Sequence, residues 1–408
     1  MKKFLPFLLS ILFLFSFDNL CFAQEPMLKK AIIFVPGVLT SGLFYNGSDS
    51  SVYKDNEAIF LSPDNKSKVR NVTGIKKFLS HHTDIFCDDN GLPINKKIGI
   101  CKSDNFPSEF DESIAKYGYG DACKKVMKFL SKTYDIGNKG NYSVIFFNYD
   151  WRLDCTHNAN LLKNTILDYD EVVLIGHSCG GLISCRAARE LYDIGQLGRI
   201  KKFISLATPF NGSVDSFYML EGGIRTTNDV IGQLIKKMHI DEIFKNFASN
   251  CTATYQLLPT KRYFLYSPSG YIESPNEEKL TYEDTINFIK SQNYYKDKEG
   301  NSKKHLEVAE NFHDALYLDD DTHILSKLDA YLIVGYGYDT VAKISLNNNS
   351  VDVVGCTDGD GTVALNESAI LDGIDKGRIF KFNCEHSQLV KDDNILNLMT
   401  EIIQSTIL

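Results

Sequence analysis

The sequence lacks an excess of basic residues, a second long apolar run and an internal repeat. Its 44 Lys and Arg residues are outnumbered by 52 Asp and Glu residues, for a formal net charge of −8. The lysines are scattered among acidic residues, whereas nucleic-acid-binding surfaces gather basic residues into a stripe with interleaved aromatic residues. We therefore expect no nucleic acid among the partners. With 43% apolar and 24% charged residues, the chain has the composition of a folded protein.

The one long apolar run lies near the N-terminus. Lys2 and Lys3 precede an apolar stretch at 4–17, and Cys-Phe-Ala at 21–23 fits cleavage before Gln24. The run is shorter than the roughly 20 residues that span a bilayer, which favours cleavage over a membrane anchor. We predict that residues 1–23 are a signal peptide. The mature chain is then expected to be soluble, and to be secreted, periplasmic or in a secretory or lysosomal lumen.

Cleavage leaves nine cysteines, which is an odd number. In an oxidising compartment at least one thiol then has no disulfide partner. Cys87 and Cys101 bracket a segment rich in turn residues, and we expect a local disulfide between them. The sequence does not determine any other pairing.

Strands and helices alternate along much of the chain. An apolar run at 31–35 ends at Pro-Gly and predicts the first strand. The later pattern predicts helices near 120–132, 158–167, 181–192 and 394–407, and strands at 142–148, 172–175, 202–207, 330–335, 350–354 and 378–382. This alternation predicts an α/β fold with a mostly parallel sheet.

Two segments interrupt the alternation. Residues 40–110 are polar and rich in turns, which predicts a variable, lid-like excursion. Residues 210–325 contain amphipathic helical pieces around 230–247 and a charged stretch at 294–305, which predicts an inserted cap. We therefore expect a core at 24–209 and 326–408 and a cap at 210–325.

The strongest chemical signal is Gly-His-Ser-Cys-Gly at 176–180. It follows an apolar strand directly and a helical pattern begins at once, which is the context of a nucleophile elbow. Glycines at 176 and 180 leave room for the tight turn against the neighbouring strand and helix. The motif predicts that Ser178 is the nucleophile of an α/β-hydrolase, with helices on both faces of the sheet and a helical cap.

A serine nucleophile needs a base and an acid, and in this fold they follow in the order acid, then His. Thr-Asp-Gly-Asp-Gly-Thr-Val at 357–363 follows a strand, and His386 is the one histidine of nine beyond it. We predict a triad of Ser178, Asp360 and His386, with Asp358 as the alternative acid. Asp-Gly-Asp-Gly as a calcium loop is a further alternative, but it lacks the ligand spacing of an EF-hand. We expect no metal and no cofactor.

The oxyanion formed during attack needs backbone N–H donors, and we predict those of Val38 and Cys179. His177 is interpreted as a packed structural histidine, because neighbouring side chains on a turn diverge. A Cys-His mechanism with Cys179 as nucleophile is an alternative, although that side chain normally turns into the core.

Three landmarks resemble the lecithin:cholesterol acyltransferase family: Val-Pro-Gly at 35–37, Tyr-Asp-Trp-Arg at 149–152 and Gly-Asp-Gly-Thr-Val at 359–363. Residues 147–212 and Leu-Leu-Pro at 257–259 are similar to it as well. The resemblance implies Ser178, Asp360 and His386 as the triad, and Val38 and Cys179 as oxyanion donors. We expect Asp150 and Arg152 to form a paired charge under the site while Trp151, the single tryptophan, fills the core.

The motifs and the resemblance together predict a secreted serine acyl-ester hydrolase of the phospholipase A or lipase type, which works through an acyl-enzyme. The expected partner is a lipid or phospholipid substrate, and peripheral contact with a membrane is left open. A lipid O-acyltransferase that uses the same acyl-enzyme is one alternative. A non-catalytic lipid-binding protein that keeps the fold is another.

Overall fold

A computed structural model describes residues 28–48, 57–60, 85–100, 123–223, 240–273, 280–347 and 350–405. The predicted signal peptide, Cys101, the helical pattern before residue 240 and much of the excursion lie outside the described residues. Within those ranges no helix is both long enough and apolar enough to cross a bilayer.

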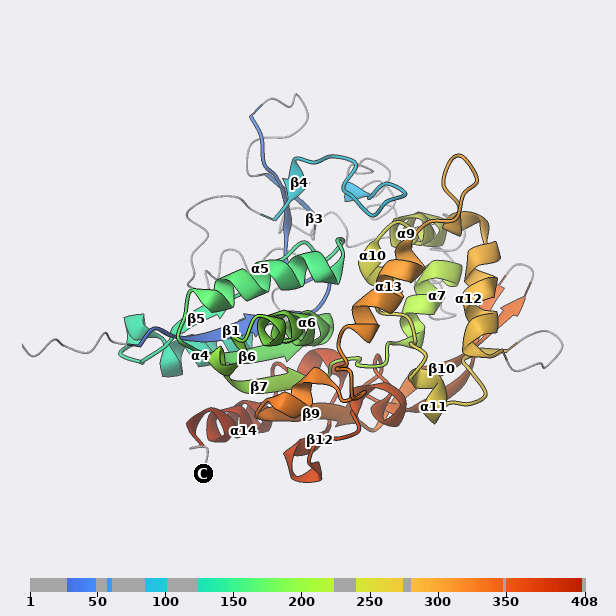
Figure 1. The fold of residues 1–408 in the computed structure, drawn as a ribbon. Helices are drawn as coiled ribbons and strands as arrows, with labels where there is room; N and C mark the ends of the chain where they lie inside the picture. Colours follow the sequence, from blue (N-terminus) through green and yellow to red (C-terminus); the bar gives the residue numbers. More distant parts are fainter. Residues whose placement is uncertain are drawn as a thin grey trace, which may run out of the picture.

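A six-stranded parallel sheet forms the centre of the fold (Figure 1). In spatial order its strands are β12 (Ile379–Asn383), β9 (Ala330–Tyr336), β7 (Ile200–Leu206), β6 (Glu171–His177), β1 (Lys30–Val35) and β5 (Ser143–Phe146). Every neighbouring pair is parallel. The central strands are nearly continuous apolar runs because both faces of a parallel sheet are covered. The predicted α/β fold with a parallel sheet is confirmed.

Helices cover both faces of the sheet, so side chains of β1 point alternately to two cores. Ile33 packs in the core of α5 (Cys155–Leu167) and α6 (Cys179–Asp193). Ile32 and Phe34 pack in the core of α4 (Lys124–Tyr134) and α14 (Asp393–Gln404). This period of two divides the apolar side chains between the two faces. Because all neighbouring strands are parallel, their carboxyl ends lie at one edge of the sheet, where the elbow lies.

The segment between β7 and β9 forms the cap, which lies beyond the carboxyl ends of the strands in Figure 1. Its elements are α7 (Val214–Gly222), α9 (Ile240–Ala248), α10 (Thr252–Gln256), α11 (Tyr263–Tyr266), β8 (Ile272–Glu273), α12 (Tyr282–Ser291), α13 (His305–Asp314), and 3₁₀ turns at Asn293–Tyr295 and Ile324–Lys327. Its own core is rich in tyrosine and includes Phe217, Tyr255 and Tyr271. An aromatic core of this kind suits short helices, since each ring buries a large area.

A long hairpin follows β9 and differs from the predicted arrangement. β10 (Tyr338–Asn347) pairs antiparallel with β11 (Ser350–Gly359), and β8 of the cap joins β10. Val341 and Ile344 pack in the core of the cap. The strand predicted at 350–354 therefore exists, but it lies outside the six-stranded sheet. Its Val353 and Val354 are exposed, whereas strands of a parallel sheet are buried on both faces.

The described part of the excursion forms a small sheet in which β2 (Leu43–Tyr45) pairs antiparallel with both β3 (Glu57–Phe60) and β4 (Ile98–Gly99). An ion pair ties it to the cap, with Asp89 Oδ1 3.2 Å from the buried Lys303 Nζ. Cys87, which we expected to pair with Cys101, is a buried free thiol, and Cys101 lies outside the described residues. This segment is therefore packed on the body of the protein.

Candidate active site

Ser178 lies at a sharp turn between β6 and α6. Its backbone has φ 54° and ψ −130°, a conformation that is costly for any residue except glycine. The Ser178 N–H donates to Leu206 O at 2.9 Å, and its carbonyl accepts from the Gly181 N–H at 2.9 Å. These bonds hold the strained turn in place, and the strand, turn and helix have the geometry of a nucleophile elbow.

Three glycines make the turn sterically feasible. A Cβ on Gly176 would lie 2.6 Å from Gly181 Cα, and a Cβ on Gly180 would lie 2.2 Å from Val35 O. A Cβ on Gly181 would lie 1.8 Å from Thr208 Oγ1. The glycines therefore let α6 begin directly against the end of β1, which carries the predicted oxyanion loop.

Asp360 and His386 form a pair at the same edge of the sheet, in which the carboxylate is buried and the imidazole is partly exposed. His386 Nδ1 lies 2.7 Å from Asp360 Oδ2. Oδ1 of the same carboxylate accepts from the N–H groups of Thr362, at 2.9 Å, and Val363, at 2.7 Å. The Asp360 side chain is only 1% exposed. The carboxylate is thereby fixed in the orientation that holds one tautomer of the imidazole.

The alternative acid has a different environment. Asp358 is exposed on β11, and its Oδ1 accepts from the Gly337 N–H at 2.6 Å. It therefore faces the turn between β9 and β10, while Asp360 faces His386. No group of three or more His, Cys, Asp or Glu residues is placed to hold a metal ion in the part of the chain that the structure describes.

The loop after β1 lies against the elbow. A Cβ on Gly37 would lie only 3.1 Å from Ser178 Cβ, so the backbone that leads to Val38 passes beside the nucleophile. Cys179 is the first residue of α6, and N–H groups of a first helical turn have no partner within the helix. The positive end of the helix dipole also favours negative charge at this position. The two predicted oxyanion donors thus flank Ser178 on two different segments.

The side chain of Cys179 points away from this site. It is fully buried, and its Sγ lies 3.7 Å from Cys155 Sγ. The pKa of the Cys155 thiol is raised well above its usual range by the hydrogen bond with Cys179 and by burial. The Cys179 side chain is therefore packed against Cys155, whose thiolate form is disfavoured, and the predicted role of Cys179 needs only its backbone N–H.

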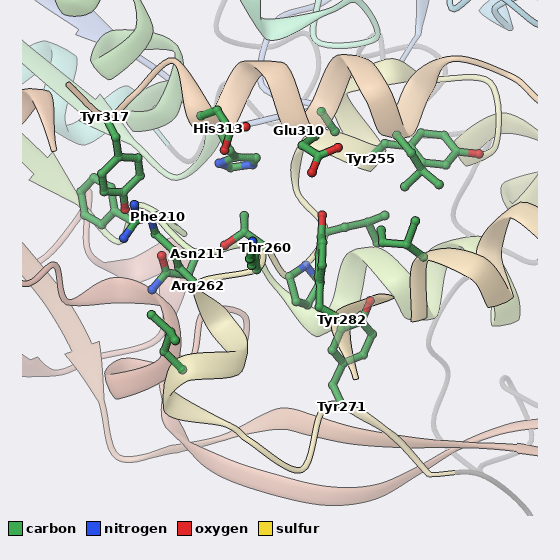
Figure 2. Close-up of a pocket in the computed structure, with 18 of the residues that line it drawn as sticks. Phe210, Asn211, Tyr255, Thr260, Arg262, Tyr271, Tyr282, Glu310, His313 and Tyr317 are labelled. Carbon is green, nitrogen blue, oxygen red and sulfur yellow. The ribbon is translucent and has the colours of Figure 1, made fainter. Parts of the chain in front are cut away.

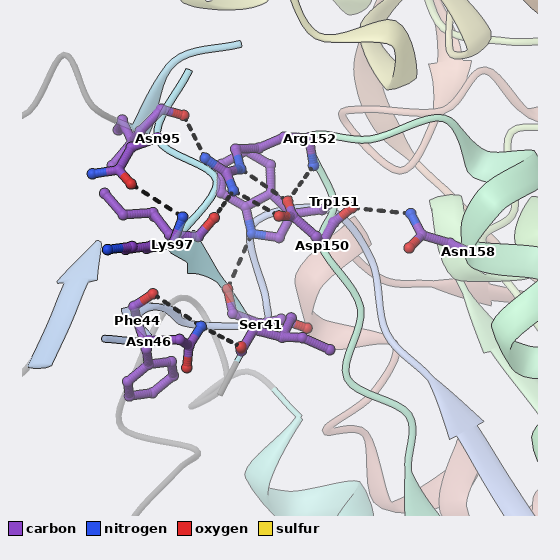
Figure 3. A network of polar contacts seen from close by, with 12 residues as sticks. Ser41, Phe44, Asn46, Asn95, Lys97, Asp150, Trp151, Arg152 and Asn158 are labelled. Carbon is purple, nitrogen blue, oxygen red and sulfur yellow. Dashed lines mark hydrogen bonds and ion pairs between the residues drawn. The ribbon is translucent and has the colours of Figure 1, made fainter. Parts of the chain in front are cut away.

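The tetrad Tyr-Asp-Trp-Arg at 149–152 contacts both the predicted oxyanion loop and the excursion, and Figure 3 shows Asp150, Trp151 and Arg152 beside Ser41. Arg152 is fully buried and binds Asp150 through Nε, at 2.9 Å, and Nη2, at 2.6 Å. Trp151 Nε1 donates to Ser41 O at 3.0 Å, and Tyr149 Oη donates to Pro36 O at 2.9 Å. The expected paired charge and the buried tryptophan are both present.

His177 is a functional candidate whose role the sequence did not reveal. It is the last residue of β6 and its ring is buried beside that of His386, with the ring centroids 5.0 Å apart. Burial and the nearby His386 lower its pKa from 6.5 to about 3. The available signal was its position directly before the nucleophile.

A hollow lies within the cap. It has a volume of about 360 Å³ and is lined by aromatic and polar side chains from α10 to α13. In Figure 2, His313 and Glu310 extend from α13 toward Thr260 and Tyr282. Among the described residues that line it there is none of the candidate triad or oxyanion residues.

A family match accounts for this arrangement. Residues 96–333, more than half of the chain, match the family model described as lecithin:cholesterol acyltransferase. The chain belongs to this family. Membership makes the protein an acyl-ester hydrolase or acyltransferase that acts on lipids. The matched range includes Ser178 and Cys179 and ends before Asp360 and His386.

One similar solved structure shows the same fold, and two others have lower TM-scores. A chain of the Tle4–Tli4 complex is 12% identical, with 92% of this chain and 99% of that chain covered and a TM-score of 0.57. A Vlm2 thioesterase domain is 16% identical over 62% of this chain and 76% of its own, with a TM-score of 0.24. A lipase-esterase related protein from Clostridium acetobutylicum is 13% identical over 70% of this chain and 90% of its own, with a TM-score of 0.21. A search of curated proteins found no match.

Proposed function

We propose that the protein is a serine hydrolase that releases fatty acids from lipid esters, in the manner of a phospholipase A or lipase. The observation that carries this proposal is the pairing of the buried Asp360 carboxylate with His386, with Oδ2 and Nδ1 2.7 Å apart, at the edge where the elbow presents Ser178. This pair leaves Nε2 of His386 free to act as the base.

The reaction divides into two steps. Ser178 Oγ forms a bond to the ester carbon and gives its proton to His386 Nε2, which passes it to the leaving alcohol as the ester bond breaks. Water then gives a proton to His386 and attacks the acyl-enzyme, and the proton returns to Ser178 as the fatty acid leaves. Asp360 stabilises the imidazolium in both steps.

The backbone N–H groups of Val38 and Cys179 are proposed to stabilise the oxyanion in each step. A donor of this kind contributes about 2.7 to 4 kcal/mol to transition-state stabilisation. Tyr149 supports this role because it binds the carbonyl of Pro36, two residues before Val38, and so holds the loop beside Ser178.

Export of the protein is part of the proposal. Its support is the N-terminal sequence, in which two lysines precede an apolar run of signal-peptide length. The substrate would then be a lipid or phospholipid met outside the cytoplasm, and peripheral contact with a membrane would bring the site to it.

An acyltransferase is the second candidate, and family membership supports it directly. It uses the same acyl-enzyme, but a lipid alcohol replaces water in the second step. Product analysis with and without a lipid alcohol separates the two, because an acylated alcohol forms only in transfer. A non-catalytic lipid-binding role would instead leave the biological activity unchanged in Ser178→Ala.

The decisive experiment combines a fluorophosphonate probe with fatty-acid release from phospholipid and triacylglycerol. Wild type is expected to be labelled at Ser178 and to release fatty acid, and Ser178→Ala to do neither. Ser184→Ala is the matched control, because Ser184 lies on α6 but its hydroxyl is buried and donates to Gly180 O at 2.7 Å. A folded wild-type protein without label at Ser178 would refute the mechanism.

A further inference from the structure

His177 links the nucleophile's strand to the loop of the proposed base through a side-chain hydrogen bond. Its Nε2 lies 3.3 Å from the backbone carbonyl oxygen of His386. β12, which precedes His386, is the edge strand of the sheet, and β9 and β7 separate it from β6. A direct hydrogen bond across this gap ties the two halves of the site together.

The chemistry of the partner determines the tautomer of His177. A carbonyl oxygen only accepts hydrogen bonds, so Nε2 must carry the proton. In a neutral imidazole Nδ1 is then a bare acceptor, and this atom is buried without a partner. Burial, together with His386, lowers the pKa of His177 to about 3, so the ring stays neutral in this tautomer at the pH of most assays.

The bond from His177 completes a set of anchors on His386. The His386 N–H donates to Asp360 O at 2.9 Å, and its Nδ1 lies 2.7 Å from Asp360 Oδ2. Both of these anchors come from one residue, Asp360. The hydrogen bond from His177 to the carbonyl oxygen adds a third anchor, and this one comes from a different element, β6.

The other side of the His177 ring faces the oxyanion loop. A Cβ on Gly37 would lie 3.4 Å from His177 Nδ1 and 3.5 Å from Ser178 Oγ. The ring therefore fills the space between the loop of the proposed base and the loop of the proposed oxyanion donor. Its shape and its donor are both placed to keep these loops at a constant separation.

We propose that His177 is a positioning residue that holds His386 against Ser178 through its neutral Nε2–H. This inference rests on the proposed function, since it assigns His386 the role of base. His177 does not take part in proton transfer itself: its one donor is used on the backbone, and its acceptor atom is buried.

Three substitutions separate the donor from the volume of the ring. His177→Gln places an amide N–H near the position of Nε2, His177→Asn is too short to reach His386 O, and His177→Phe keeps the volume without a donor. We expect kcat to fall about 10- to 100-fold in the Phe and Asn variants with KM nearly unchanged, because a misplaced base slows only the chemical step. The Gln variant should recover most of the loss.

Thermal unfolding verifies that the three variants fold alike. Equal kcat in wild type and His177→Phe would overturn the proposal, as would an equal loss in the Gln and Phe variants. Ser178→Ala is measured in the same activity assay. Retained activity in Ser178→Ala refutes the proposed function. Loss of activity in Ser178→Ala together with normal activity in all His177 variants refutes only the positioning role.

A second measurement does not depend on activity. Spectra of ¹⁵N-histidine-labelled full-length protein report which ring nitrogen carries the proton, and the His177 signals are assigned by their absence in His177→Gln. We expect a neutral His177 with its proton on Nε2 across about pH 6 to 8, since its pKa is far below that range. A proton on Nδ1, or titration within that range, would refute the hydrogen bond to His386 O.

Discussion

Replacing Asp360 with Asn tests the acid of the proposed triad at the level of single hydrogen bonds. Asp360 has three donors around its two oxygens: two backbone N–H groups on Oδ1, at 2.9 and 2.7 Å, and the His386 Nδ1 on Oδ2, at 2.7 Å. Asn has one oxygen and one NH₂ group, so it cannot accept from all three.

The two backbone N–H donors determine whether the oxygen or the NH₂ group of the new amide faces His386. Its oxygen keeps the two N–H donors, and its NH₂ then faces Nδ1 of His386. That nitrogen must become an acceptor, so the proton of the imidazole moves to Nε2, which can no longer take a proton from Ser178. We expect kcat/KM to fall about 10⁴-fold, or about 5.4 kcal/mol, with the fold intact.

The assay is fatty-acid release with purified wild type, Asp360→Asn and Asp358→Asn. The last is the matched control, because Asp358 is an exposed carboxylate two residues away that accepts from the Gly337 N–H and not from His386. Its activity should stay within about twofold of wild type. A folded Asp360→Asn variant with less than a tenfold loss, or an equal loss in Asp358→Asn, would refute the assignment.

The remaining predictions concern a buried ion pair, a buried histidine and the oxyanion loop. Arg152→Met should lower the free energy of unfolding by about 3 to 5 kcal/mol in urea titrations, because it leaves Asp150 buried and unpaired; adding Asp150→Leu should recover part of the loss. His323→Asn should flatten the pH dependence of stability. Burial lowers the pKa of His323 from 6.5 to about 3, so below pH 6.5 the unfolded chain binds a proton that the folded chain does not. Between pH 7.5 and 5 the free energy of unfolding of wild type should therefore fall by about 2 kcal/mol more than that of the variant. Equal pH dependence of the free energy of unfolding in the two proteins would contradict this. Asn also preserves the helix cap that His323 supplies. Cys179→Ala should retain kcat within about threefold, since only its N–H is used, whereas Gly37→Ala, with Cβ 3.1 Å from Ser178 Cβ, should lower kcat/KM at least about tenfold in the same esterase assay.

The central strands were predictable because their burial has a local signature. β1 and β6 are nearly continuous apolar runs, and a parallel sheet covered on both faces demands such runs. β10 had no such signature, since polar residues such as Asp339 and Lys343 alternate with Val341 and Ile344 along it. Its apolar face is buried by the cap, a partner that periodicity along one segment does not identify.

The choice between two acids shows a similar limit within the site. Asp358 and Asp360 are two residues apart in one loop sequence, and neither spacing nor charge separates them. Family resemblance favoured Asp360, and the structure places that side chain on His386 while Asp358 binds the Gly337 N–H. Side-chain direction at the end of β11 is set by its pairing with β10, the strand that the sequence did not predict.

Arg152 connects the excursion at 40–110 to the candidate active site. Besides Asp150, its guanidinium donates to the backbone carbonyls of Ile85 and Ile98, both at 2.7 Å. Carbonyl groups are present whatever the side chain, so residues of the 85–98 segment can be replaced without loss of these two bonds. The family match begins only at residue 96, so most of the excursion lies outside it. We therefore expect side-chain replacements in the 85–98 segment to leave the tetrad, and the predicted oxyanion loop that Tyr149 contacts, in place.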